Sequence, residues 1–173
     1  MTTETTNLTT QVYRVWIKAP REKIWAAIVD PEFNTRYGYS APGFYDLKPG
    51  GSYTSTANQG MKDYAAQSGF EVPDIIVDGE VIEVDEPRLL VQTWRMLMDP
   101  TTAAEPFTRL TYEIDESTTQ PGVCKLTVTH ELVGAPATAA MVAGSDEAGA
   151  GGGWAWILSD LKSMLETGKS FSD

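Results

Sequence analysis

Cysteine and histidine are almost absent from this sequence: Cys124 and His130 are the only ones among 173 residues. A lone cysteine cannot form an internal disulfide, so a reducing, cytoplasmic location is expected. One histidine without a second histidine at helical spacing, and one cysteine without a CxxC partner, match none of the common zinc patterns. The carboxylates are scattered, so we expect no metal site and no cofactor.

Positive charge is scarce as well, since 13 Lys and Arg residues stand against 24 Asp and Glu residues, a net charge of −11. This excess disfavours nucleic acid and anionic membrane surfaces as partners. No stretch approaches the roughly 18 apolar residues that a bilayer-spanning helix needs, so membrane insertion is not expected. Residues 1–10 lack the positive start and apolar centre of a signal peptide, and they are expected to form a disordered tail.

The remaining pattern predicts a single α+β domain over residues 11–168, followed by a short tail, residues 169–173. Residues 11–18 are rich in β-branched and aromatic side chains and predict a strand. Residues 20–29 repeat apolar residues four apart and predict a helix, which a short second helical turn follows, ending near Gly38.

About six strands are predicted between residues 43 and 132. We expect a long polar loop at residues 58–74 and a shorter one at residues 99–106. The last strand alternates so that His130 shares the apolar face with its leucine and valine neighbours, which predicts an antiparallel sheet with one wet side. Arg95 and Arg109 could anchor a ligand carboxylate, but alternation favours an outward, solvated position for both.

A long amphipathic helix is predicted at the end of the chain. Asp160, Lys162 and Glu166 are assigned to its wet side, and Gly168 is well placed to terminate it. Because a sheet with one apolar face must be covered, we predict a curved antiparallel sheet of about six to seven strands wrapped around this helix. Its apolar face comprises Trp154, Ile157, Leu158, Leu161, Met164 and Leu165.

Glycine is concentrated directly before that helix, at Gly149 and at residues 151–153. One interpretation is a flexible lead-in, with the helix proper starting at Trp154. The other is that the missing side chains leave space beneath the helix or let the backbone approach a ligand closely. Asp146 and Glu147 would complement the positive end of a helix beginning near Ser145 instead.

Five segments occur in the order typical of a known family: IKAPREKIWAAIVDPEF, DLKPGG, GEVIEVDEPRLLVQTW, LTVTHE and GGGWAWILSDLKSMLETG. The chain resembles the branch of the START-like, helix-grip (Bet v1-like) superfamily that is related to the C-terminal domain of the activator of Hsp90 ATPase. The resemblance implies a cavity between the sheet and the long helix. Members bind lipids, hormones, pigments or polyketide-like molecules, a few are enzymes, and many bacterial members have no assigned role.

Two departures concern the expected cavity mouth. Residues 34–39 lack the tryptophan pair common in the family, and residues 58–74 are longer and more polar than its short hairpin. The Hsp90-stimulating motif of the eukaryotic activator belongs to a separate N-terminal domain, which this sequence has no room for. Contact with Hsp90 is therefore not expected, and a homodimer stays open.

Aromatic and methionine side chains on the inward faces are the main candidates for a binding site. Apolar walls with a few hydroxyls are typical of small-molecule pockets. For each residue, the alternative is that it only fills the core. The candidates are Tyr37, Tyr39, Tyr53, Trp94, Met96, Met98, Tyr112, His130, Met141 and Trp154.

Three functions remain open at this point. The first is non-catalytic binding of a small hydrophobic or aromatic ligand, such as a lipid, a polyketide or a flavonoid-like compound. The second is a cyclase, dehydratase or hydrolase that uses His130 as acid or base. The third is a chaperone-assisting interaction module. No GxSxG elbow is present, and GAGGGW lacks the lysine and hydroxyl of a phosphate-binding loop.

Overall fold

The computed structural model describes residues 9–145 and 151–173. Most of the predicted N-terminal tail lies outside these residues, as do Asp146, Glu147 and Gly149. The described chain forms one seven-stranded antiparallel sheet with the strand order β1-β7-β6-β5-β4-β3-β2. The strands are β1 (Thr10–Ile17), β2 (Gly43–Tyr45), β3 (Ser52–Thr56), β4 (Ile75–Asp85), β5 (Leu89–Met96), β6 (Thr108–Glu116) and β7 (Cys124–Glu131).

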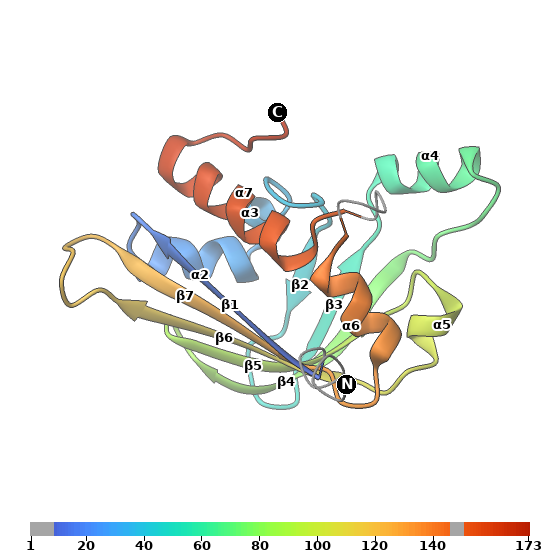
Figure 1. Ribbon diagram of the computed structural model, residues 1–173, viewed down its shortest axis with the longest axis horizontal. Coiled ribbons are helices and arrows are strands. Elements are labelled where there is room, and N and C mark those ends of the chain that lie inside the picture. The colour runs from blue at the N-terminus through green and yellow to red at the C-terminus, as the bar shows by residue number, and fades with distance from the viewer. Residues whose placement is uncertain (1–8, 146–150) are drawn as a thin grey trace, which may run out of the picture.

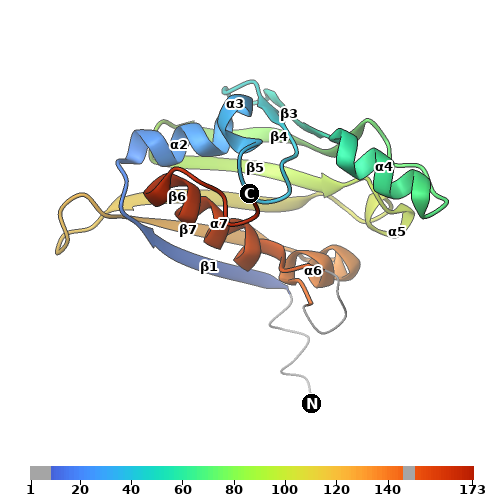
Figure 2. The ribbon, with the colours of Figure 1, turned by 90° about the horizontal axis from the view of Figure 1, so that it is seen from above.

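Helices cover one side of this curved sheet, as Figures 1 and 2 show. The prediction of an α+β fold, with a curved antiparallel sheet wrapped around a C-terminal helix and two short helices after the first strand, is confirmed. No helix in the described part of the chain is long and apolar enough to cross a bilayer. The helices are α2 (Arg21–Val29), α3 (Pro31–Asn34), α4 (Gln59–Gln67), α5 (Pro100–Ala103), α6 (Pro136–Ala143) and α7 (Gly153–Thr167).

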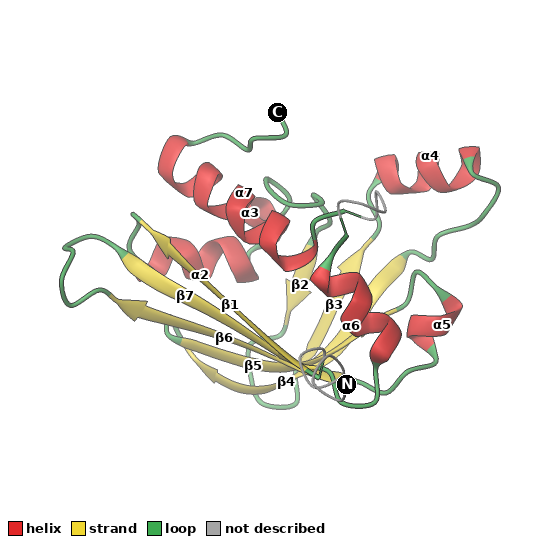
Figure 3. Cartoon of the chain, viewed as in Figure 1, coloured by secondary structure: helices red, strands yellow, loops and turns green. Residues whose placement is uncertain are grey.

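Short helices occupy the two regions that were predicted to be loops. Helix α4 lies within residues 58–74, where the Asn58 side chain caps it by accepting a hydrogen bond from the Met61 N–H. Helix α5 lies within residues 99–106, and Asp99 caps it in the same way. Asp, Asn and Pro at a helix start are helix signals as well as turn signals, so the composition alone was misleading. Figure 3 shows both helices at the same end of the sheet.

Helix α6 was not predicted, and it precedes α7 as a separate element. Its first turn is held by Glu105, whose carboxylate accepts hydrogen bonds from the N–H groups of Ala137 and Thr138 and from the Thr138 hydroxyl. Because Glu105 is far away in sequence, this cap depends on the tertiary fold. The short second helix, α3, ends at Asn34 rather than near Gly38.

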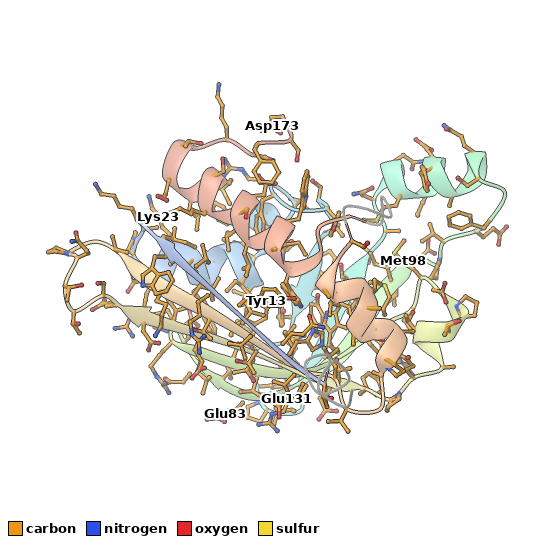
Figure 4. The ribbon with its side chains drawn as sticks, in the orientation of Figure 1. Tyr13, Lys23, Glu83, Met98, Glu131 and Asp173 are labelled. Carbon is orange, nitrogen blue, oxygen red and sulfur yellow. The ribbon has the colours of Figure 1, made fainter. Side chains whose placement is uncertain are left out.

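The wet side that was assigned to α7 needs one correction. Asp160 is completely buried, since its carboxylate accepts hydrogen bonds from the Gly38 N–H at 2.8 Å and the Phe171 N–H at 2.9 Å. The Ser170 hydroxyl donates to it as well, at 2.8–2.9 Å. Residues after the helix thus fold back over α7, where Figure 4 shows Asp173. Gly168 ends α7 in the left-handed conformation, as predicted.

The glycines before α7 serve a contact between helices. A Cβ atom on Gly153 would lie 2.2 Å from the Val142 carbonyl oxygen, and one on Gly144 would lie 2.5 Å from the Gly152 carbonyl carbon. The start of α7 therefore presses against the end of α6, where no side chain fits. Helix α7 begins at Gly153, close to the predicted Trp154.

Candidate functional site

A pocket of about 440 Å³ lies between the sheet and the helices. Strands β3 to β6 supply its floor, and helices α6 and α7 and the segment from α3 to β2 supply its walls. Met61 of α4 and Met98, which follows β5, line it as well. Figure 4 shows Met98 at the end of the sheet where α4 lies. The other principal lining residues of the pocket are Tyr37, Tyr39, Tyr45, Tyr53, Trp94, Met96, Tyr112, Met141, Val142, Gly153, Trp154 and Ile157.

Nine of the ten candidate residues line this pocket, and His130 does not. Whether the nine bind a ligand stays a prediction. Tyr45 and Met61 also line the pocket, although neither was a candidate. Tyr45 could have been found from the turn Lys48-Pro49-Gly50-Gly51, because the hairpin built on it places Tyr45 directly opposite Tyr53. Met61 could not, because its position depends on α4.

Tyrosines form the polar part of the pocket. The rings of Tyr45 and Tyr53 stack with centroids 4.4 Å apart, and the Tyr45 hydroxyl donates to the Gln92 Oε1 atom at 2.7 Å. The Tyr37 hydroxyl donates to the Ala27 carbonyl oxygen at 2.8 Å. Burial raises the pKa of Tyr53 to about 12, and it also raises the pKa of Tyr37, Tyr45 and Tyr112. All four hydroxyls are therefore uncharged at physiological pH.

No charged side chain lines the pocket within residues 9–145 and 151–173. The two arginines considered as carboxylate anchors are engaged elsewhere. Arg95 makes two hydrogen bonds to Asp78, at 2.7 and 3.0 Å, and Arg109 pairs with Glu131 at 3.4 Å. Figure 4 shows Glu131 on the side of the sheet that faces away from the helices. The prediction of outward positions for both arginines agrees with these contacts.

His130 lies behind the pocket wall, where it is completely buried. The Trp154 indole N–H donates to its Nδ1 atom at 3.1 Å, and its Nε2 atom lies 2.7 Å from the Thr108 hydroxyl. That hydroxyl donates to the Trp94 carbonyl oxygen at 2.9 Å. These three hydrogen bonds join Trp154 of α7 to Trp94 of β5 through His130.

The direction of these bonds fixes the form of the imidazole. An indole N–H can only donate, so Nδ1 of His130 carries no proton and the proton of the neutral ring sits on Nε2. Nε2 then donates to Thr108, whose own proton goes to Trp94. Burial lowers the pKa of His130 to about 4. The ring is therefore neutral near pH 7 with both nitrogens occupied, which gives the acid-base hypothesis no support.

No group of three or more His, Cys, Asp or Glu residues is arranged to hold a metal ion in the described part of the chain. Asp160 is a buried carboxylate and could be considered for a functional role. Its oxygens already accept hydrogen bonds from three donors, however, and it does not line the pocket. Its bond to the Gly38 N–H instead fixes the pocket-lining segment on α7.

Replacing Asp160 by asparagine should destabilise the fold by about 2 kcal/mol, because an amide nitrogen would face a donor that the carboxylate now accepts. Urea-induced unfolding measures this change. Glu166→Gln, which breaks a partly exposed ion pair with Lys162 on the same helix, should change stability by at most about 0.5 kcal/mol. Equal effects of the two variants would contradict the assigned role of Asp160.

Known proteins share this fold. Protein MLL2253 from Mesorhizobium loti is 18% identical with a TM-score of 0.62, and the match covers 90% of this chain and 96% of that one. PFC0360w, an HSP90 activator from Plasmodium falciparum, is 20% identical with a TM-score of 0.53, covering 95% and 91%. DynU16, a protein of the dynemicin biosynthetic locus, is 22% identical with a TM-score of 0.62 over 94% of this chain.

These likenesses concern the fold alone. The chain spans only about half the length of DynU16, 49%. A comparison with curated proteins finds no match. The family model described as activator of Hsp90 ATPase homolog 1-like protein matches residues 18–166, which is most of the chain. The resemblance seen in the sequence is thus confirmed, and with it the START-like, helix-grip fold: the chain belongs to the activator of Hsp90 ATPase homolog 1-like family.

Proposed function

We propose that this protein binds a small, largely apolar ligand with aromatic character in the pocket between the sheet and helices α6 and α7, without catalysing a reaction. The observation that carries this proposal is the lining itself. Trp94, Trp154 and four methionines supply apolar surface, and the tyrosine hydroxyls supply a few polar groups. The volume of about 440 Å³ falls within the range of small-molecule sites.

Family and fold give further support. One structural neighbour comes from the dynemicin biosynthetic locus, so the same fold occurs beside genes for a small-molecule product. Hsp90 contact is left out of the proposal, because the Plasmodium activator is only 20% identical and shares the fold alone. Catalysis is left out because His130 stands outside the pocket with both ring nitrogens engaged.

Native mass spectrometry of freshly purified protein, followed by calorimetric titration of lipids, polyketides and flavonoids, tests the proposal. A co-purifying small molecule or a saturable heat signal supports it, whereas the absence of both across a broad panel would count decisively against it.

Filling part of the pocket should weaken this binding. Met141→Trp adds bulk to the lining, and we expect affinity to fall at least tenfold, roughly the effect of losing one or two well-packed ligand contacts. Val133→Trp is the matched control, since Val133 is 71% exposed and does not line the pocket. Calorimetry on both variants, with circular dichroism to verify folding, checks the prediction. Unchanged affinity in folded Met141→Trp would place the ligand elsewhere.

A further inference from the structure

The pocket offers hydroxyl groups but no charge. Its described lining contains no Asp, Glu, Lys, Arg or His residue, and the charged groups considered for it are engaged elsewhere. Arg95 is paired with Asp78, and Asp160 already accepts from Gly38 and from the C-terminal residues. A ligand that entered with a carboxylate would lose its hydration without gaining a counter-charge, which is a strongly unfavourable exchange.

Three of the pocket's hydroxyl groups lie close together. Tyr45 and Tyr53 stack on neighbouring strands, and the pKa of Tyr45 is raised first by burial and then by the nearby hydroxyls of Tyr53 and Tyr112. Burial is also the main reason for the raised pKa of Tyr112, and Tyr53 adds to it. The three hydroxyls thus form one uncharged group, which we call the tyrosine group.

The tyrosine group can exchange hydrogen bonds with a ligand hydroxyl. The proton of Tyr45 goes to Gln92, so the Tyr45 oxygen is left as an acceptor. Tyr53 and Tyr112 each carry a proton of their own, because their pKa values are raised. A hydroxyl is both donor and acceptor and therefore suits such a group, whereas an ether can only accept a hydrogen bond and an aliphatic chain can form none.

The remaining lining favours a ring system. The indole N–H of Trp154 donates its hydrogen bond to His130, so Trp154 presents only apolar surface to the pocket. Met61, Met96, Met98 and Met141 surround the same space. Methionine side chains adapt to irregular shapes and make favourable sulfur–aromatic contacts. This part of the pocket suits an aromatic ring system that carries no further hydrogen-bonding groups.

We infer that the pocket selects uncharged phenolic compounds: the phenol hydroxyl binds the tyrosine group, the aromatic body packs among the tryptophans and methionines, and ionised ligands such as fatty acid anions are rejected. This inference rests on the proposed function, because it concerns the same pocket. It narrows the ligand class to uncharged compounds and states where the phenol hydroxyl of the ligand binds.

Equilibrium dialysis near pH 7 with three probes of one ring system tests it: naphthol, naphthalene and naphthoate, the substituents on the same carbon. We expect naphthol to bind about threefold or more tighter than naphthalene, the gain of one hydrogen bond. Naphthoate should bind at least about tenfold more weakly than naphthol, because its charge finds no partner.

Variants of the tyrosine group locate the effect. Tyr53→Phe and Tyr112→Phe should reduce the preference for naphthol over naphthalene while leaving naphthalene binding unchanged. Tyr64→Phe is the control, since Tyr64 is 68% exposed and does not line the pocket. A preference that survives in both pocket variants would overturn the assignment of the hydroxyl to this group.

The outcomes separate the two proposals. Tight binding of naphthoate, or equal binding of all three probes, would leave ligand binding intact and overturn the selection of uncharged phenols. If none of the probes binds but another ligand class from the titration panel does, the function stands and the inference falls. If nothing binds, both fall together.

Discussion

Replacing Gly153 by alanine is expected to cost at least about 3 kcal/mol of folding free energy. The new Cβ would lie 2.2 Å from the Val142 carbonyl oxygen and 2.8 Å from the Gly144 nitrogen, and both of these are backbone atoms. Gly153 also has φ of +58°, which disfavours any side chain. Strain and overpacking each cost roughly 1–3 kcal/mol, and neither a rotamer change nor solvent can relieve this contact.

Gly168→Ala is the matched control for this prediction. Gly168 ends the same helix at φ of +83°, and a Cβ there would meet no atom within 4 Å. Alanine should therefore cost only the conformational penalty, about 1 kcal/mol. Chemical unfolding of both variants measures the difference. Similar losses would show that backbone conformation alone explains the glycines, and the close contact between α6 and α7 would lose its energetic role.

The contact of Gly153 with α6 also shows where sequence reasoning stops. The glycine run was visible, and its two interpretations were a flexible lead-in and a space beneath the helix. In the structure Gly144 and Gly153 lack side chains where two helix ends meet, and Gly153 also lines the pocket. The local pattern marks α6 only by Pro136 at its first position, whereas its cap by Glu105 and its contact with α7 depend on the tertiary fold.

Periodicity succeeded where elements are long and half buried. The strands and α7 were predicted because alternation and the apolar stripe repeat over many residues. The same periodicity placed Asp160 on the wet side of α7, and there it was wrong. Three hydrogen-bond donors, from the segment after α3 and from the residues after α7, gather at that position and replace water. Such partners cannot be read from the spacing within one helix.

The candidate site was predictable in composition but not in detail. Inward parity identified Tyr53, Trp94 and Tyr112, since alternate residues of a strand share a face. Parity also placed His130 on that face correctly. It did not reveal that Trp154 would reach its Nδ1 atom and close the hydrogen-bonding chain to Thr108. That contact changes His130 from a catalytic candidate into a residue that holds Trp154 in place.

The neutrality of His130 should make the fold sensitive to acid. In the unfolded chain the imidazole binds a proton with its ordinary pKa of 6.5, whereas in the folded chain burial lowers the pKa to about 4. Between these values the unfolded state binds more protons, so stability falls as the pH falls. The contribution of the neutral ring is complete above pH 6.5. It drops by about 2 kcal/mol at pH 5 and by about 3 kcal/mol at pH 4.

Two measurements check this directly. His130 is the only histidine, so its imidazole gives a single set of NMR signals that needs no assignment. These signals should stay constant from pH 8 to about pH 5, and titration near pH 6.5 would refute the buried neutral form. In chemical unfolding, His130→Asn keeps an acceptor for Trp154 but cannot titrate, so its stability should fall less between pH 6.5 and 5 than that of the natural chain. Because the carboxylates are common to both proteins, the difference between their slopes of stability against pH isolates the contribution of the imidazole. Protonation of His130 would place an N–H at Nδ1, where it would face the indole N–H of Trp154.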